Sequence, residues 1–258
     1  MVDFHSHILY GVDDGSESKE MSMAMIKQSI IEGVTHLAMT PHHVVGGFTK
    51  AMDDKENYLL KFKELEKEFE GRIKLIPSLE IMFYDEILED LEDHKIMGYN
   101  AKKTVLIEYS LVDYPIASEA VFYNLKKKGY QVILAHPERN SAIRDDEDIL
   151  YHLHDLGVLF QLNAGSLKGQ FGGAVKNFAE RLIEVNLIHA VGSDGHKPDR
   201  RNMEIRYAYD RIFELNPPLY DCIMQNGKKL ILGEEVQVLS PKPWIKNTKK
   251  SLLRLFKK

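Results

Sequence analysis

Val2-Asp3-Phe4-His5-Ser6-His7-Ile8-Leu9 lies near the amino end of the sequence, and Asp13-Asp14-Gly15 follows shortly afterwards. Residues 2–4 are predicted to form a short strand that delivers two imidazoles one position apart. In extended backbone, residues i and i+2 point to the same side, so His5 and His7 can approach one ion together. A histidine pair with aspartates just downstream suits a divalent metal of borderline softness. The amino end therefore predicts a metal site.

The composition is that of a soluble globular protein, with 44% hydrophobic and 28% charged residues in a chain of 258. The formal net charge of −5 is unevenly distributed, because residues 240–258 contain seven Lys or Arg residues and no acid. Without those seven, 27 basic residues face 39 acidic ones, so residues 1–239 carry −12. A body this acidic argues against nucleic acid as a partner.

No targeting or membrane-spanning segment is expected. The first residues form a charged strand rather than a signal peptide, and no apolar run is long enough to cross a bilayer. The single cysteine, Cys222, excludes an internal disulfide framework and fits a reducing cytoplasm. We therefore expect a cytoplasmic protein with one domain over residues 1–239 and a basic, amphipathic tail over residues 240–258.

Strand-like and helix-like segments alternate along the chain. Five helix-like segments end in a Gly or Asn residue, as expected for a capping residue in a left-handed conformation, and an apolar run follows each. These residues are Gly33, Gly71, Gly129, Gly157 and Asn186. Strands are predicted at residues 2–5, 34–40, 72–80, 104–108, 130–136, 158–163 and 187–194. Helices are predicted at residues 17–32, 53–70, 116–128, 146–156, 174–185, 203–215 and 220–232.

This alternation predicts an α/β fold with a parallel sheet and right-handed crossovers. Seven such units favour a closed or nearly closed barrel, and an open doubly wound sheet is the alternative. No glycine-rich dinucleotide-binding motif follows the first strand, which leaves a barrel without that cofactor as the preferred fold.

Active sites of β/α barrels lie at the carboxyl ends of the strands. Every predicted strand ends in a metal-binding or strongly polar side chain after an otherwise apolar run. The predicted metal ligands are His5, His7, Asp14, His42, Glu80, Glu108, His136, Asp194 and His196. Five imidazoles and four carboxylates are too many for one ion, so a cluster of two or three ions is predicted. Buried carboxylates in this number would repel one another without cations between them.

The ligand types also indicate the chemistry. A shell of nitrogen and oxygen without thiolate suits manganese, iron or zinc. In such a cluster one ion lowers the pKa of a water molecule while a neighbouring ion binds the substrate, which is the chemistry of hydrolysis. Arg139 lies just beyond His136, and Arg200 and Arg201 follow His196. Because guanidinium is a preferred donor to phosphate oxygens, the sequence favours phosphoester hydrolysis over amide or amidine hydrolysis.

Several motifs together resemble the PHP (polymerase and histidinol phosphatase) superfamily. They are Asp3-Phe4-His5-Ser6-His7, Thr40-Pro41-His42, Ala135-His136-Pro137-Glu138-Arg139 and Ser193-Asp194-Gly195-His196. The segment from His5 to Gly15 is similar to the bacterial metal-dependent protein-tyrosine phosphatases of capsule and exopolysaccharide loci. The resemblance covers roughly residues 1–235. It implies a distorted (β/α)7 TIM-like barrel, a trinuclear manganese centre and phosphotyrosine as the substrate.

The resemblance also implies roles for individual residues. One ion would be held by His5, His7, Glu80 and Asp194. A second would be held by Asp14, His42 and His196, and a third by Glu108 and His136, with Glu80 bridging. Arg139 and Arg201 would be the catalytic, phosphate-binding arginines, and Arg200 is the alternative to Arg201. Mn²⁺ is the expected metal, with two to three ions per chain, although Fe or Zn would accept the same ligands.

The partner implied by the resemblance is a phosphotyrosine-containing protein, a membrane-associated tyrosine autokinase that controls polysaccharide export. The basic tail contains Trp244 and an apolar stripe of Leu252, Leu255 and Phe256 at helical spacing. Because such a segment can lie on an anionic membrane, we hypothesise a peripheral contact at the inner face of the membrane. A solubilising terminus and a helix packed on the barrel are the alternatives.

Two other functions are compatible with the motifs. A small-molecule phosphatase such as histidinol-phosphate phosphatase would use the same ligands, and a non-catalytic metal-binding interaction module would keep them without turnover. The complete ligand set argues against the second of these functions.

Overall fold

The computed structural model describes residues 1–47 and 51–245. Within these ranges, nine strands form two sheets in which all neighbouring strands are parallel. The first sheet has the order β1 (Val2–Asp3), β2 (His36–Met39), β4 (Lys74–Pro77). The second has the order β3 (His42–His43), β5 (Glu80–Met82), β6 (Thr104–Glu108), β7 (Gln131–Ala135), β8 (Leu159–Asn163), β9 (Ala190–Gly192).

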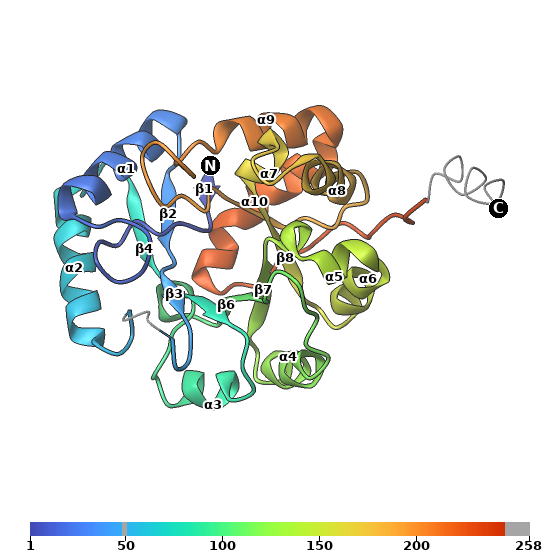
Figure 1. Cartoon of the computed structure of the whole chain (residues 1–258), viewed down its shortest axis with the longest axis horizontal. Coiled ribbons are helices and arrows are strands. Elements are labelled where there is room, and N and C mark those ends of the chain that lie inside the picture. The colour runs from blue at the N-terminus through green and yellow to red at the C-terminus, as the bar shows by residue number, and fades with distance from the viewer. Residues whose placement is uncertain (48–50, 246–258) are drawn as a thin grey trace, which may run out of the picture.

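Most of the helices lie around the outside of the curled sheets (Figure 1). They are α1 (Lys19–Glu32), α2 (Lys55–Glu68), α3 (Ile87–Glu92), α4 (Ser118–Lys127), α5 (Ser141–Asp145), α6 (Asp148–Asp155), α7 (Ala164–Lys168), α8 (Gly173–Glu184), α9 (Arg206–Leu215) and α10 (Pro217–Leu232), with 3₁₀ turns η1 (Tyr99–Ala101) and η2 (Pro137–Arg139). The seven predicted helices are confirmed, with small differences at their ends. The short helices α3, α5 and α7 were not predicted, because so few residues give no clear periodicity.

The strand predicted at residues 72–80 is divided into β4 and β5, and the short strand β3 follows the one predicted at residues 34–40. Pro41, which has no N–H to donate to the ladder, separates β2 from β3. The backbone stays beside its neighbour across the break, since Ser78 N–H donates to Met39 O at 3.0 Å and Glu80 N–H donates to Pro41 O at 3.1 Å. Consequently His42 and Glu80 begin short strands, whereas the sequence predicted them at the ends of longer ones.

The two sheets are joined by hydrogen bonds between the chain after β1 and the chain around β9. Phe4 N–H donates to Val191 O at 3.0 Å, and Asp194 N–H donates to His5 O at 2.8 Å. Ser6 and Gly195 continue this parallel pairing. The first and last strands therefore lie side by side, and the residues that follow both of them reach the same place.

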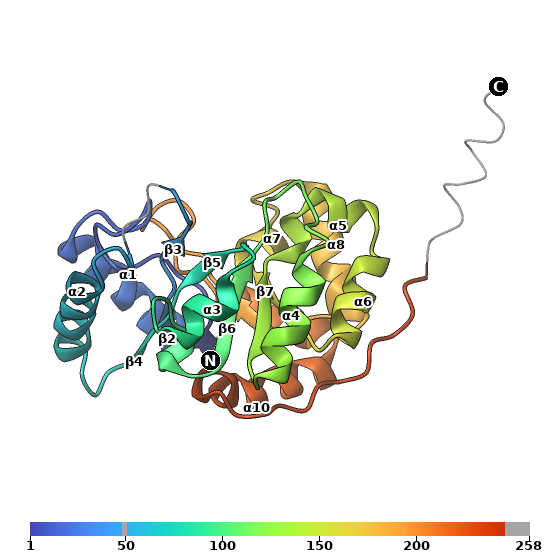
Figure 2. The ribbon, with the colours of Figure 1, turned by 90° about the horizontal axis from the view of Figure 1, so that it is seen from below.

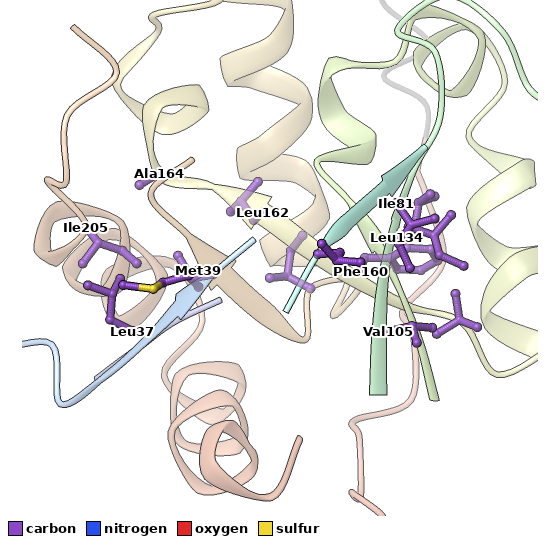
Figure 3. Packing of buried hydrophobic residues seen from close by; sticks show 14 of the residues in the cluster. Leu37, Met39, Ile81, Val105, Leu134, Phe160, Leu162, Ala164 and Ile205 are labelled. Atoms are coloured by element: carbon purple, nitrogen blue, oxygen red, sulfur yellow. The ribbon is translucent and has the colours of Figure 1, made fainter. Parts of the chain in front are cut away.

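Strand side chains alternate between an outer and an inner hydrophobic core. The outer core fills the space between the strands and the helices, and Figure 3 shows part of it, including Leu37, Val105, Leu134 and Phe160. The inner core consists of Val2, Phe4, Ala38, Ile76, Tyr99, Leu106, Ile133, Ala135, Leu159, Ala190, Leu230 and Ile231. Because Leu230 and Ile231 come from α10, this helix closes the end at which the strands begin (Figure 2).

The inner face becomes polar toward the carboxyl ends of the strands. On β6 the inner residue Leu106 is followed two positions later by Glu108, and on β8 Leu159 is followed by Gln161 and Asn163. All of these side chains are buried. The fold thus provides a sealed apolar end and a polar end on which functional side chains can gather.

Part of the predicted tail packs on the outer helices. Lys242 N–H donates to Val185 O at 2.9 Å, and the Trp244 ring centroid lies 5.1 Å from that of Phe178. Residues 246–258, which include Leu252, Leu255 and Phe256, lie outside the described residues. In the two described ranges, no helix is both long and apolar enough to cross a membrane.

The buried His189 gives the fold a testable dependence on pH. Burial, together with the nearby His154, lowers the pKa of His189 to about 3. The unfolded state binds a proton below about pH 6.5 and the folded state does not, so the free energy of unfolding should fall as the pH falls from about 6.5 to about 3. His189→Gln should remove a slope of about 1.4 kcal/mol per pH unit, measured by urea unfolding across this range.

The matched control for that measurement is His152→Gln, since His152 is an exposed histidine on the same outer layer. The part of the slope that His189→Gln removes should persist in His152→Gln. Equal slopes for the unsubstituted chain and His189→Gln would show that His189 does not supply the dependence.

Candidate metal centre

All nine predicted ligands converge at the polar end of the sheets. His5 and His7 follow β1, Glu108 ends β6, His136 follows β7, and Asp194 and His196 follow β9. His42 and Glu80 begin β3 and β5, and Asp14 lies in the loop after β1. Side chains far apart in the sequence therefore share one site because their strands run in the same direction.

Glu80 lies at the centre of the cluster. Its Oε2 atom is 3.0 Å from His5 Nε2, 3.2 Å from His7 Nε2 and 3.0 Å from His42 Nδ1. Its Oε1 atom is 2.8 Å from His136 Nε2. One carboxylate thus faces four imidazoles, which is the arrangement expected of a ligand shared between ions.

The remaining ligands surround this carboxylate. Asp194 Oδ1 lies 3.6 Å from His5 Nε2 and 3.4 Å from His7 Nε2. Three sets of side chains bring their ligand atoms within 4.8 Å of one another. These sets are His5, His7 and Glu80; His7, Asp14, His42 and His196; and His42, Glu80 and Glu108.

The loop that carries Asp14 folds tightly against His7. A Cβ atom on Gly15 would come within 2.0 Å of His7 O, so only glycine fits at this position. Ser16 N–H donates to the same carbonyl at 2.9 Å. The close approach brings Asp14 Oδ1 to 3.4 Å from His196 Nε2.

Neighbouring side chains orient the first two histidines. His5 Nδ1 lies 2.9 Å from Gln161 Oε1, and His7 Nδ1 lies 2.7 Å from Asp13 Oδ2. Both oxygens accept a hydrogen bond from Nδ1–H, which leaves the Nε2 lone pairs facing the cluster. Carboxylate or carbonyl partners of this kind fix the tautomer of metal-binding histidines.

Strained backbone is concentrated at the site. His136, Asp194 and Arg201 have φ angles of 32°, 52° and 49°, in the left-handed region that residues with a side chain rarely adopt. Such strain persists only where the surroundings enforce it, and it is commonly found at functional sites.

The electrostatics of the cluster favour ionised carboxylates. Burial opposes ionisation of Glu80, but His5 and His42 outweigh it and hold the pKa of Glu80 well below its usual range. Burial likewise opposes protonation of His42, yet the facing Glu80 and Glu108 raise the pKa of His42 to about 10. Protons on the histidines thus supply the positive charge that metal ions would supply, and metal binding would release them.

The nitrogen and oxygen atoms of the cluster are better placed to coordinate metal ions than to form hydrogen bonds with one another. Glu80 Oε2, His42 Nδ1 and His196 Nε2 are buried and have no hydrogen-bond partner. Buried polar atoms are nearly always paired, so three orphans in one cluster indicate ligands for an ion. The nitrogen and oxygen donors suit manganese, iron or zinc.

Two arginines extend over the same site. Arg139 Nη1 lies 2.8 Å from Asp194 Oδ2, and Arg201 Nη2 lies 2.6 Å from Asp194 Oδ1. Arg200 is exposed. Of the two adjacent arginines in the sequence, Arg201 is therefore the one beside the cluster. Both Arg139 and Arg201 line a cavity of about 340 Å³ together with Glu80, Glu108 and His136.

Asp13 and Gln161 were not predicted to belong to the site, and Asn163, at the end of the strand predicted over residues 158–163, had no predicted role. Asp13 accepts hydrogen bonds from the backbone N–H groups of Gly15 and His42 as well as facing His7. Gln161 and Asn163 link His5 to Asp194, since Gln161 Nε2 donates to Asn163 Oδ1 and Asn163 Nδ2 donates to Asp194 Oδ2. The alternation of Gln161 and Asn163 on β8 and the paired aspartates before Gly15 are the sequence features that could have indicated these residues.

The curled parallel sheet and the cluster together define a class of α/β protein that presents nitrogen and oxygen ligands for metal ions at the carboxyl ends of its strands. A family model described as "Capsular polysaccharide synthesis, CpsB/CapC" matches residues 1–231. The chain belongs to this CpsB/CapC family.

Known proteins similar to this chain extend the comparison. The tyrosine-protein phosphatase YwqE of Bacillus subtilis is 34% identical over 249 residues, covering 94% of this chain and 96% of YwqE. A crystal structure from a study of YwqE and Streptococcus pneumoniae CpsB, described as unique metal-dependent tyrosine phosphatases, has a TM-score of 0.87 at 33% identity, covering 95% of this chain and all of that one.

A more distant structure shares the fold. Histidinol phosphate phosphatase from Lactococcus lactis, complexed with zinc, L-histidinol and phosphate, has a TM-score of 0.55 at 15% identity. The match covers 83% of this chain and 92% of that one. At this identity the likeness concerns the fold alone.

Proposed function

We propose that this chain is a metal-dependent protein-tyrosine phosphatase. The observation that carries the proposal is the cluster around Glu80, with Arg139 and Arg201 beside it, in a chain similar over nearly its whole length to YwqE. The ligand atoms suit metal ions, and the guanidinium groups suit a phosphoryl group.

The proposed metal assignment is the one that the resemblance implies, and the ligand sets around His5 and around Asp14 support its first two ions. His5, His7, Glu80 and Asp194 hold one ion; Asp14, His42 and His196 hold a second; Glu108 and His136 hold a third, with Glu80 bridging. The shared position of Glu80 supports its bridging role, and the closeness of Asp14 Oδ1 to His42 Nε2 and His196 Nε2 supports the second ion. We propose Mn²⁺ as the metal, with two to three ions per chain, and Fe or Zn as ions that the same ligands accept.

The arginines and the ions have different parts in the reaction. When bound, the ions would provide Lewis acidity that lowers the pKa of water and neutralises phosphoryl charge. Arg139 and Arg201 bind the phosphoryl oxygens and orient the ester, because planar guanidinium groups donate paired hydrogen bonds. Their common partner Asp194 holds both groups at the edge of the cluster until the phosphoryl group competes for them.

The proposed finer architecture is a single distorted (β/α)7 barrel of the PHP type over residues 1–239. In this description β2 with β3, and β4 with β5, each count as one interrupted strand. The hydrogen bonds between the chain after β1 and the chain around β9 support closure. The basic tail over residues 240–258 is the second part of the proposed organisation.

The proposed partner is a tyrosine autokinase associated with the membrane, in keeping with a family named for capsular polysaccharide synthesis. We place the enzyme in the cytoplasm, at the inner face of the membrane when the tail contacts anionic lipid. The acidic body supports a protein rather than a nucleic acid as the substrate.

Hydrolysis of a phosphotyrosine peptide is the direct test of the proposed function. The manganese-loaded chain should release phosphate from the peptide faster than from histidinol phosphate, chelation should stop the reaction, and added Mn²⁺ should restore it. His136→Ala and Asp194→Ala should abolish turnover. Preference for histidinol phosphate would instead indicate a small-molecule phosphatase, and no hydrolysis of either substrate would indicate a non-catalytic module.

The adjacent arginines provide a matched pair of variants. Arg201→Ala should lower kcat/KM for the phosphotyrosine peptide by about 10²-fold, since one charge-stabilising donor to the transition state is lost. Arg200→Ala removes the same charge from an exposed neighbour and should leave kcat/KM close to that of the unsubstituted chain. Equal losses in both variants would mean that only the net charge near the site matters.

A further inference from the structure

The cavity beside the metal cluster has an apolar wall as well as a polar floor. Its lining includes Val44, Met82 and Leu111 in addition to the ligands and arginines. Metal ions and phosphoryl groups are bound by polar and charged atoms, so these apolar side chains do not contribute to binding either of them. The wall therefore indicates that the part of the substrate next to the phosphoryl group is apolar.

The segment that carries Leu111 is held in place from the arginine side of the site. Asn140 Nδ2 donates to Ser110 O and to Asp113 O, each at 2.7 Å, and Ser141 N–H donates to Leu111 O at 2.8 Å. Asn140 is buried and directly follows Arg139. The hydrogen bonds thus fix the position of the wall relative to the arginine that is proposed to bind phosphate.

The loop that carries Leu111 has further apolar side chains that are exposed to solvent. Leu111 and Ile116 are 42% and 72% exposed, and Val45, in the loop after β3, is 60% exposed. Strands β3, β5 and β6 are neighbours in one parallel sheet, so both loops leave from the same edge. Grouped apolar side chains around a site are typical of a binding surface.

We propose that Val44, Met82 and Leu111 bind the aromatic ring of the phosphotyrosyl residue and so select aryl over alkyl phosphates. This inference rests on the proposed phosphatase function and names the residues that give it tyrosine specificity. With the phosphoryl group at Arg139 and Arg201, the ester oxygen joins it to a ring that lies along the wall. A phosphoserine side chain has no ring to cover the wall, so it leaves that apolar surface in water.

Binding of two phosphonates to the manganese-loaded full chain tests this inference without requiring turnover. Phenylphosphonate and methylphosphonate carry the same anionic head and cannot be hydrolysed at the P–C bond. Leu111→Ala should weaken phenylphosphonate binding roughly tenfold, as measured by calorimetry, because a hydrophobic contact is lost. Methylphosphonate binding should stay unchanged, since it does not reach the wall.

Val112→Ala is the matched control, because Val112 is the next residue, is more exposed and does not line the cavity. It should bind both phosphonates as the unsubstituted chain does. Val44→Ala provides a second wall variant and should also reduce the preference for the phenyl compound. If both wall variants keep the preference of the unsubstituted chain, the inference is wrong even where phosphotyrosine is hydrolysed. If the wall variants lose the preference for phenylphosphonate but the unsubstituted chain hydrolyses no phosphate ester, the phosphatase proposal is wrong and the inference about the wall stands.

Discussion

The concentration of buried carboxylates against imidazoles is the interaction on which the rest of this structure depends. Glu80 is fully buried and faces four histidines, while Asp194 faces three histidines and two arginines. Charges taken out of water at this density are strongly unfavourable unless opposite charges neutralise them. Protons on the histidines meet this requirement only in part, because Glu80 Oε2 and two histidine nitrogens have no hydrogen-bond partner. The groups are held in this unfavourable arrangement by the strained backbone of His136 and Asp194, by the hydrogen bond that His5 donates to Gln161 and by the one that Asn163 donates to Asp194.

The fold tolerates this arrangement because one end of the strands is apolar and well packed, while the charged groups are confined to the other end. At the end where the strands begin, the inner core is apolar and α10 closes it with Leu230 and Ile231. At the other end, the same inner face presents Glu108, Gln161 and Asn163. The hydrophobic stabilisation gained along one half of each strand offsets the unfavourable desolvation at the other half. The proposed aryl-binding wall of Val44, Met82 and Leu111 continues this division, since the apolar part of the substrate would lie beside the charged part of the site.

Much of this organisation was predictable because polar residues interrupt apolar runs at regular places. The strand ends gave His5, Glu108, His136 and Asp194 directly, and the parallel topology explains why they meet. The interruption at Pro41 was not predicted, because a proline near the end of an apolar run is equally compatible with the end of a strand. Asp13 and Gln161 were missed because their partners depend on tertiary contacts rather than on spacing. The position of Leu111 depends on hydrogen bonds from Asn140, which no local pattern reveals.

The metal content of Glu80→Gln, measured by elemental analysis after manganese loading, tests the central claim most directly. If Glu80 is shared between ions, this variant should lose more than one ion per chain while its circular dichroism spectrum is unchanged. Glu108→Gln, which alters a carboxylate assigned to a single ion, should lose at most one. A Glu80→Gln chain that retains the metal content of the unsubstituted protein would contradict the account.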